Sequence, residues 1–292
     1  MWGDAFLEIA TPGEARAYVR RWHAGGAECI KVYSSLPWSL KRIVADEAHR
    51  VGLPLAGHGL SIGEIVRSIT LGFLTLEHTA GPIYDDVIRL MALSETCWDP
   101  TLTVGEKSAI HVQEDPGRFA DAKIRTFVPA AALAATLRGP GMLSGRSLEA
   151  LHAGWRAKLE RIRAAYQGGV GLLDGTDALM SGIFFGPSLH WELEYLAEAG
   201  LPAIEVLRLA TVGAAGAVGA SADPGSLEVG KPADLVLLDA DPLSDMRNTQ
   251  KIWRVIKDGR VSDPERLRTR APDARPVPPA SEVSEFHQKE MR

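Results

Sequence analysis

Four residues whose side chains can bind a metal ion or move a proton lie in or near the ends of short apolar runs. His58 follows LPLAG and His78 follows GFLTLE, whereas Lys31 lies within AECIKVY and Asp177 follows VGLLDGT. If these runs are neighbouring parallel strands, the four side chains meet at the C-terminal strand ends, where α/β barrels keep their active sites. Imidazole and carboxylate groups are good ligands for zinc and similar divalent ions. An ammonium group repels a cation, so Lys31 becomes a ligand only when it is carbamylated.

Strand and helix patterns alternate around these four residues. Apolar runs predict strands at 27–33, 53–57, 72–77 and 170–174, and a further run ends at 97–100. Helices are predicted at 11–25, 37–52, 62–71 and 84–93, with a long helical connection at 103–167 and further helices at 188–199 and 202–211. Strands that alternate with helices indicate βαβ units and a parallel sheet, hence an α/β fold. Strands at 233–238 and 252–256 predict a small antiparallel sheet separate from the parallel one.

The composition is that of an ordinary globular protein, and a small-molecule substrate fits it better than nucleic acid or a membrane. Of the 292 residues, 46% are hydrophobic and 24% are charged, and the net charge is −5. A net negative charge gives no electrostatic reason to expect nucleic acid or an anionic membrane as the partner. The sequence has two cysteines, which argues against a disulfide framework and for the cytoplasm. We find no signal peptide, and no uncharged apolar run approaches the ~18 residues of a membrane span.

Seven stretches of the sequence share motifs with one enzyme superfamily. They are GAECIKVYSS, LAGHG, TLEHT, DPTLTV and DGTDA, followed by HWELEYLAEAGLPAIEVLRLAT from His190 and GSLEVGKPADLVLLDADPLSDMRNTQKIWRVIKDGRV from Gly225. These stretches resemble the amidohydrolase superfamily, in particular its imidazolonepropionase-like and Xaa-Pro dipeptidase-like members. The resemblance runs from about Thr11 to Val261, and its last stretch is the most specific.

The resemblance implies a fold and a role for each of the four residues. The fold is a partial TIM-type (β/α) barrel made of strands four to eight, with the C-terminal half of a small β-sandwich. Lys31 matches the carbamylated lysine of strand four, and His58 and His78 match the metal-binding histidines of strands five and six. Asp177 matches the strand-eight aspartate, which binds metal and is the general base toward the attacking water. The implied cofactor is a divalent metal, expected to be zinc, with one or two ions.

The sequence departs from the superfamily at one part of this site. The superfamily's first strand carries an HxH pair, and no HxH occurs here. By the resemblance, strands one to three and the N-terminal half of the sandwich are absent. The metal position that uses Lys31, His58 and His78 keeps its ligands, whereas the position that uses HxH and Asp177 lacks two. The alternative hypothesis is therefore a truncated, non-catalytic homologue, or half of an assembly that needs the missing N-terminal segment.

Each candidate also has a purely structural interpretation. A lone histidine such as His58 is more often a packed or surface residue than a ligand, and Lys31 can extend to solvent from an apolar run. Asp177 in Gly-Thr-Asp can be a turn or helix-capping residue. His190 is interpreted as a substrate-contacting or ligand-supporting group, with a solvent-facing position at a helix start as the alternative. Tyr33 is interpreted as a residue that lines the pocket, with core packing as the alternative. Glu77 is interpreted as a hydrogen-bonding, ligand-supporting residue, with a direct metal ligand as the alternative.

We therefore expect a metal-dependent hydrolase of amidohydrolase type. Its reaction is cleavage of an amide or cyclic amide C–N bond in a small molecule of the dipeptide or N-acyl amino acid class, by metal-activated water. The expected domains are a partial hydrolase barrel at 1–220, sandwich strands at 221–262 and a flexible tail at 263–292. A homo-oligomer or a complementing chain is the expected macromolecular partner, with no nucleic acid and no membrane.

Overall fold

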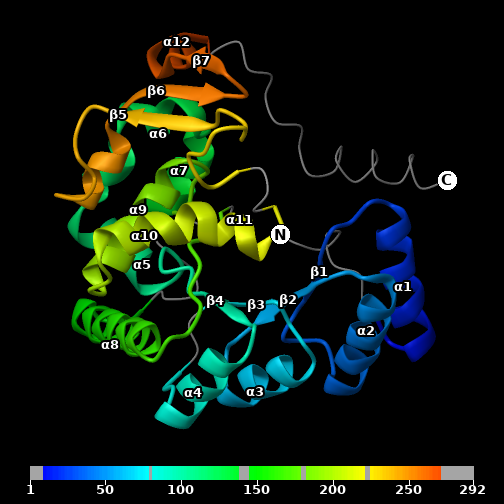
Figure 1. Ribbon diagram of the computed structural model, residues 1–292. Helices are drawn as coiled ribbons and strands as arrows, with labels where there is room; N and C mark the ends of the chain where they lie inside the picture. The colour runs from blue at the N-terminus through cyan, green and yellow to red at the C-terminus, as the bar shows by residue number, and fades with distance from the viewer. Residues whose placement is uncertain (1–8, 79–80, 138–144, 179–181, 221–223, 271–292) are drawn as a thin grey trace.

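A four-stranded parallel sheet forms the centre of the N-terminal half of the protein. The computed structural model describes residues 9–78, 81–137, 145–178, 182–220 and 224–270. The strands pair in the order β1 (Ile30–Val32), β2 (Leu55–His58), β3 (Thr75–Glu77) and β4 (Cys97–Asp99). The helices that alternate with them are α1 (Pro12–Ala24), α2 (Trp38–Val51), α3 (Ile62–Thr70) and α4 (Asp85–Leu93) (Figure 1). The predicted alternation and the α/β class are therefore confirmed.

The ends of the first two helices follow from local sequence. Thr11 caps α1 by accepting a hydrogen bond from the backbone N–H of Glu14, and the Glu14 carboxylate accepts one from the Thr11 N–H. This reciprocal pair satisfies two backbone donors that the helix itself leaves free. Helix α2 ends at Gly52, whose φ of 78° lies in the left-handed region that glycine adopts without a side-chain clash.

The two faces of the parallel sheet differ sharply in polarity. Apolar side chains on the outer face are at most 5% exposed and pack on the surrounding helices: Ile30, Val32, Leu55, Leu76 and Trp98. The register places Lys31 beside Ala56, and His58 beside Glu77, which in turn lies beside Asp99. Because side chains alternate between the two faces of a strand, Lys31, His58, Glu77 and Asp99 all lie on the inner face.

The prediction of a full strand at 170–174 is wrong. Among the described residues it makes a single parallel bridge, between Leu172 and Trp98. The Trp98 N–H donates to the Gly171 carbonyl and the Leu173 N–H donates to the Trp98 carbonyl. This segment therefore extends the sheet beside β4 by one pair of hydrogen bonds, and the described strands form an open sheet and not a closed barrel.

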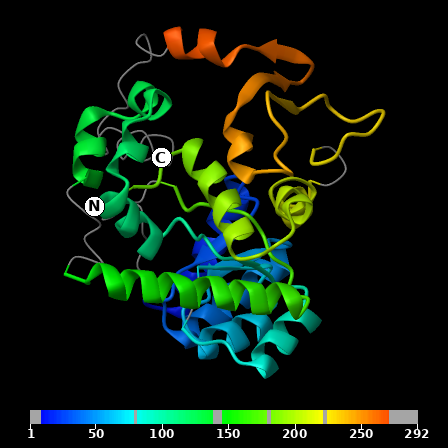
Figure 2. The same ribbon diagram turned by 90° about the vertical axis from the view of Figure 1, so that its left-hand side faces the viewer.

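Helices make up the middle of the chain. The connection expected at 103–167 contains α5 (Glu106–Glu114), η1 (Pro116–Ala120), α6 (Ala122–Phe127), α7 (Ala130–Leu137) and α8 (Leu148–Gln167). It is followed by α9 (Pro187–Glu198), α10 (Ala203–Arg208), the π-helical turn η3 (Leu209–Gly213) and α11 (Ala214–Ala217). Ile110, Leu151 and Leu196 from these helices share one hydrophobic core with Leu76 and Trp98 of the sheet. The long helix α8, which contributes Leu151 to this core, runs across the near side of the molecule in Figure 2. No helix in the described ranges is long and apolar enough to cross a membrane.

A second, antiparallel sheet lies at the opposite end of the molecule from the parallel one (Figures 1 and 2). It contains β5 (Leu235–Leu238), β6 (Ile252–Lys257) and β7 (Arg260–Ser262), with η4 (Met246–Gln250) between the first two. The predicted antiparallel sheet is thus confirmed, whereas the sandwich stays a prediction. The segment expected as a flexible tail starts with a helix, α12 (Pro264–Arg270), because Asp263 accepts a hydrogen bond from the Glu265 N–H and pairs with Arg254. Residues 271–292 lie outside the described residues.

Candidate active site

Side chains predicted from the sequence gather at the C-terminal ends of the strands. The imidazole centroids of His58 and His78 are 4.9 Å apart, and the Tyr33 ring lies edge-on at 4.6 Å from His58. Lys31 Nζ lies 3.9 Å from Glu77 Oε1, and His78 Nε2 lies 3.9 Å from Asp177 Oδ2. The chain segments that carry these residues are far apart in the sequence, so the parallel sheet is what brings them together.

A neighbouring hydroxyl group lies beside the Nδ1 atom of each of the two imidazole rings. His78 Nδ1 lies 2.7 Å from Thr101 Oγ1, and His58 Nδ1 lies 3.4 Å from Ser34 Oγ. In each ring the Nδ1 atom is therefore engaged by a neighbouring side chain and the Nε2 atom is the one left for the site. Metal-binding histidines characteristically make such a second hydrogen bond, because it sets the tautomer and the ring orientation.

The backbone at two of these residues is held in an uncommon conformation. His78 has a φ of 72° and Asp177 a φ of 50°, both in the left-handed region. For residues other than glycine this costs on the order of 1–3 kcal/mol, and such residues cluster at functional sites. Hydrogen bonds compensate at His78, whose N–H donates to the Asp99 carbonyl and whose carbonyl accepts from the Trp98 indole at 2.5 Å.

Burial controls the charge state of the basic groups. Desolvation, followed by the nearby Lys31 ammonium, lowers the pKa of His58 and of His78 to about 4 each. Both imidazoles are therefore neutral at pH 7, which is the form that binds a metal. Desolvation also lowers the pKa of Lys31, although the Glu77 carboxylate acts in the opposite direction.

Three acidic residues that the sequence analysis did not assign to the site lie at or near the strand ends. Burial and the neighbouring Glu77 carboxylate raise the pKa of Asp99 to about 7. The Asp99 carboxylate lies against Gly175 so closely that any Cβ at Gly175 would overlap it. Both oxygens of Asp174 are buried and lack a hydrogen-bond partner within the described residues, and burial raises the pKa of Asp174 well above its ordinary value. The same cause raises the pKa of Glu192, which is fully buried.

The positions of these missed residues carry a signal that the sequence does show. Asp99 ends a predicted apolar run, as Glu77 does, and Ser34 and Thr101 each come two residues after the end of a strand. Polar residues directly after a parallel strand face the same opening as the catalytic candidates. The sequence alone could not show that Glu192, from helix α9, reaches the loop after β4.

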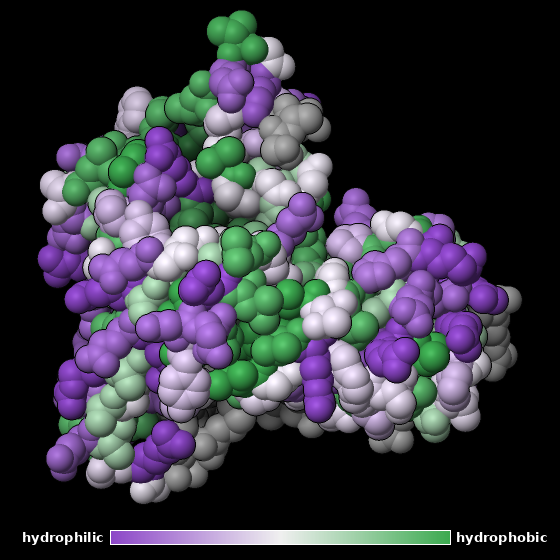
Figure 3. All heavy atoms as spheres, turned by 60° about the horizontal axis from the view of Figure 1, so that its bottom comes forward, coloured by the Kyte–Doolittle hydropathy of each residue, from purple (hydrophilic) through white to green (hydrophobic). Residues whose placement is uncertain are grey.

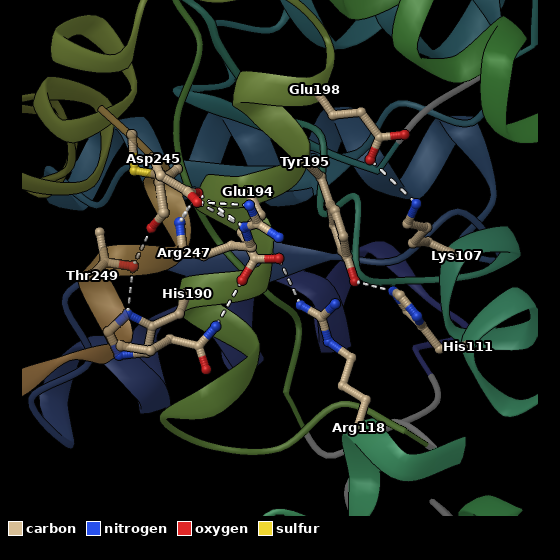
Figure 4. Close-up of polar contacts among 12 residues, drawn as sticks. Lys107, His111, Arg118, His190, Glu194, Tyr195, Glu198, Asp245, Arg247 and Thr249 are labelled. Atoms are coloured by element: carbon tan, nitrogen blue, oxygen red, sulfur yellow. Dashed lines mark hydrogen bonds and ion pairs between the residues drawn. The ribbon is translucent and has the colours of Figure 1, made fainter. Parts of the chain in front are cut away.

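His190 lies apart from the strand-end group. Its Nδ1 atom is 3.0 Å from Thr249 Oγ1, and the Thr249 hydroxyl donates to the Met246 carbonyl at 2.8 Å (Figure 4). Since a hydroxyl has one proton, Thr249 accepts from His190, and His190 carries its proton on Nδ1. His190 lines a cavity of about 850 Å³ between η1, α6, α9 and the antiparallel sheet, and the described lining includes none of the other sequence-predicted site residues. Its role toward a substrate stays a prediction.

The donor set can be tested as a metal site from its chemistry. Within the described ranges, no group of three or more His, Cys, Asp and Glu side chains could by itself hold a metal ion. The strand-end group reaches a ligand set only when Lys31 is included as a carbamate. Its lowered pKa raises the fraction of neutral amine above that of an ordinary lysine, and the neutral amine is the form that reacts with carbon dioxide. With neutral imidazoles oriented through Nδ1 and a carboxylate beside His78, the residues present fit a divalent ion in this carbamylated form.

Comparison with known proteins identifies the family. The amidohydrolase family profile matches residues 30–262, which is more than half of the chain. The chain belongs to the amidohydrolase family. No curated protein sequence matches the chain.

Solved structures similar to this chain include several hydrolases. A Xaa-Pro dipeptidase with bound methionine shares 23% identity and a TM-score of 0.67 over 87% of this chain and 59% of its own. A candidate prolidase from Bifidobacterium longum shares 25% identity and a TM-score of 0.64, over 97% of this chain and 65% of its own. Phenylurea hydrolase B shares 23% identity and a TM-score of 0.66, over 92% of this chain and 59% of its own. The chain therefore spans less than two thirds of the length of each of these three proteins. The comparisons give no support to the alternative of a non-catalytic homologue.

Proposed function

We propose that this amidohydrolase cleaves an amide or cyclic amide C–N bond of a small molecule, of the dipeptide or N-acyl amino acid class. The observation that carries the proposal is the convergence of Lys31, His58, His78 and Asp177 at one end of the parallel sheet. The names of a Xaa-Pro dipeptidase and of phenylurea hydrolase B among the similar structures support hydrolysis of a bond to nitrogen.

The metal in this proposal is a divalent ion, and zinc is the expected one. Carbamylated Lys31, His58 and His78 would hold it, with Asp177 beside them, and the expected number is one or two ions. When bound, such an ion polarises the substrate carbonyl and lowers the pKa of water, which supplies the nucleophile at neutral pH.

Asp177 has the accessibility that a proton-transferring residue requires. Its side chain is 47% exposed while its Oδ2 atom faces His78 Nε2, so it can reach both the site and a water molecule that enters from solvent. We assign Asp177 as the general base that takes one proton from the attacking water as the new C–O bond forms. The same proton is delivered to the leaving nitrogen as the C–N bond breaks, which gives a carboxylic acid and an amine.

The remaining strand-end side chains are suited to supporting roles. Tyr33 is 40% exposed and lies edge-on to His58, so its ring both packs the imidazole and forms part of the opening. Glu77 accepts a hydrogen bond from Thr75 at 2.6 Å and lies 3.9 Å from Lys31 Nζ, where it pairs with the lysine before carbamylation. We propose that Glu77 positions Lys31 and that Tyr33 contacts the substrate.

The predicted macromolecular partner, a second copy or a complementing chain, is also a proposal. Large hydrophobic side chains are exposed on several elements, among them Leu93 at 83% and Val261 at 66%. Hydrophobic residues also gather across the middle of one face, between two areas rich in hydrophilic residues (Figure 3). Contiguous exposed apolar surface of this kind is typical of protein interaction sites.

Metal content and an activity screen test the proposed function together. The purified protein is incubated with bicarbonate and Zn²⁺, Co²⁺ or Mn²⁺, its bound metal is measured by mass spectrometry, and it is assayed on dipeptides and N-acyl amino acids. We expect about one or two bound ions, and loss of both metal and activity in Lys31→Ala and His78→Ala. His23→Ala, which changes an exposed histidine of α1, is the matched control. A protein that binds no divalent metal, with activity unchanged in Lys31→Ala, would show the proposal to be wrong.

A further inference from the structure

The Glu192 carboxylate is buried completely and is satisfied by backbone alone. It lies on α9 with 0% of the residue exposed. Its Oε1 atom accepts from the Leu102 N–H at 2.5 Å and its Oε2 atom from the Thr103 N–H at 2.7 Å. A buried carboxylate costs folding free energy unless its oxygens are hydrogen bonded, and both oxygens here are used on one short turn. Within the described residues no basic side chain bonds to it.

The turn that Glu192 holds follows β4 and has a fixed, unusual shape. Thr101 has a φ of 43°, in the left-handed region, and the Val104 N–H donates to the Thr101 carbonyl. On its other side the Val104 carbonyl accepts from Lys158 Nζ of α8 at 3.0 Å. Buried side chains from α8 and α9 therefore hold this turn together: Glu192 bonds to Leu102 and Thr103, and Lys158 bonds to Val104.

Each of the two threonines of this turn contacts a different part of the strand-end site. Thr101 Oγ1 lies 2.7 Å from His78 Nδ1, and Thr103 Oγ1 donates to the Thr176 carbonyl at 3.0 Å. Thr176 directly precedes Asp177 in the chain. The orientation of the His78 ring and the position of the Asp177 segment thus both depend on where the turn lies.

We propose that Glu192 is a positioning residue, which fixes the 101–104 turn from α9 and thereby sets the His78 imidazole and the Thr176–Asp177 segment for their roles. The inference deepens the proposed function and rests on it for the catalytic part. It gives a reason for a buried glutamate on α9: its two side-chain oxygens accept from two N–H groups, whereas a glutamine amide supplies one acceptor and one opposing donor.

The experiment compares Glu192→Gln with Glu198→Gln. Glu198 lies on the same helix, but its carboxylate pairs with Lys107 and Trp155 and not with the turn. Three quantities are measured on the full chain: amide hydrogen exchange at Leu102 and Thr103, the side-chain nitrogen shifts of His78 in the metal-free protein, and Co²⁺ affinity with bicarbonate present. Steady-state kcat and KM are added once a substrate is in hand.

We expect Glu192→Gln to speed exchange at Leu102 or Thr103 by about tenfold or more, to shift the His78 signals and to weaken Co²⁺ binding by about 10- to 100-fold, as removal of ligand-supporting groups does. The kcat falls while KM stays within about twofold, because the turn orients groups and does not bind substrate. Thr101→Val, which removes the hydroxyl beside His78, gives a Co²⁺ loss that does not add to that of Glu192→Gln. Glu198→Gln stays within about twofold of the wild type in every quantity.

A folded Glu192→Gln variant with wild-type exchange, His78 signals and Co²⁺ affinity overturns the inference, as does a Glu198→Gln variant with equal losses. If Glu192→Gln is not recovered folded, Glu192→Asp decides in the same assays, since its carboxylate is one methylene too short to reach both N–H groups. A wild-type protein without metal binding or activity refutes the proposed function instead. Exchange and His78 signals in the metal-free protein then still decide whether Glu192 holds the turn.

Discussion

His190 makes stability depend on pH in a way that can be calculated. Burial, followed by the Lys123 charge, lowers its pKa to about 4, whereas the imidazole in the unfolded chain has its ordinary value of ~6.5. Below pH 6.5 the unfolded chain gains a proton at this residue and the folded protein does not. The stability contributed by the neutral imidazole is therefore complete above pH 6.5, falls as the pH drops and is lost near pH 4.

The size of this stability loss follows from the folded and unfolded pKa values of His190. Between pH 7 and pH 5, proton uptake by the unfolded state alone lowers the free energy of unfolding by about 2 kcal/mol for this one residue. His190→Asn removes the titrating group but keeps a side-chain donor for Thr249. We expect its free energy of unfolding to fall about 2 kcal/mol less than that of the wild type over this pH range.

Urea unfolding curves at pH 7 and pH 5, each fitted to a two-state model, measure this difference in the free energy of unfolding. Contributions from the other titrating groups are common to both proteins and cancel. His23→Asn, at an exposed position of α1, serves as the control and should follow the wild type. Equal losses of stability in His190→Asn and in the wild type would refute the reasoning, because they would mean that burial does not keep this imidazole neutral.

Three further predictions concern the strand-end site. Asp177→Asn should lower kcat by about 10²- to 10⁴-fold with the melting temperature unchanged, and a loss below about tenfold in a steady-state assay would exclude it as the general base. Gly175→Ala should destabilise the protein by about 1–3 kcal/mol in urea unfolding, because its Cβ meets the Asp99 carboxylate. Gly63→Ala on α3 should not destabilise it, because its Cβ would meet the Ser61 hydroxyl at an ordinary contact distance of 3.9 Å. Removal of metal with a chelator should abolish activity, and return of metal without bicarbonate should restore less than return with it; equal recovery would argue against a Lys31 carbamate.

Much of the fold could be predicted from the chain because the signals are local. The capping box at Thr11 and Glu14, the glycine that ends α2 and the apolar runs of β1 to β3 each depend on neighbours in the sequence. The strand at 170–174 could not be judged in this way. Its apolar pattern is that of a buried strand, but a strand also needs a partner along its length, and here the pairing is confined to one bridge.

The sequence by itself determined which side chains stand at the strand ends, since the period of two and the parallel order fix the inner face that Lys31, His58 and Glu77 occupy. The sequence did not determine which side chains contact these strand-end residues and orient them. Only the tertiary structure showed that Thr101 and Ser34 orient the imidazoles, that Glu192 holds the turn from 90 residues away along the chain, and that His190 lines a different cavity. The physical reason is that these contacts join side chains on separate helices and loops. Their distances depend on how the elements pack and leave no period or spacing in the sequence.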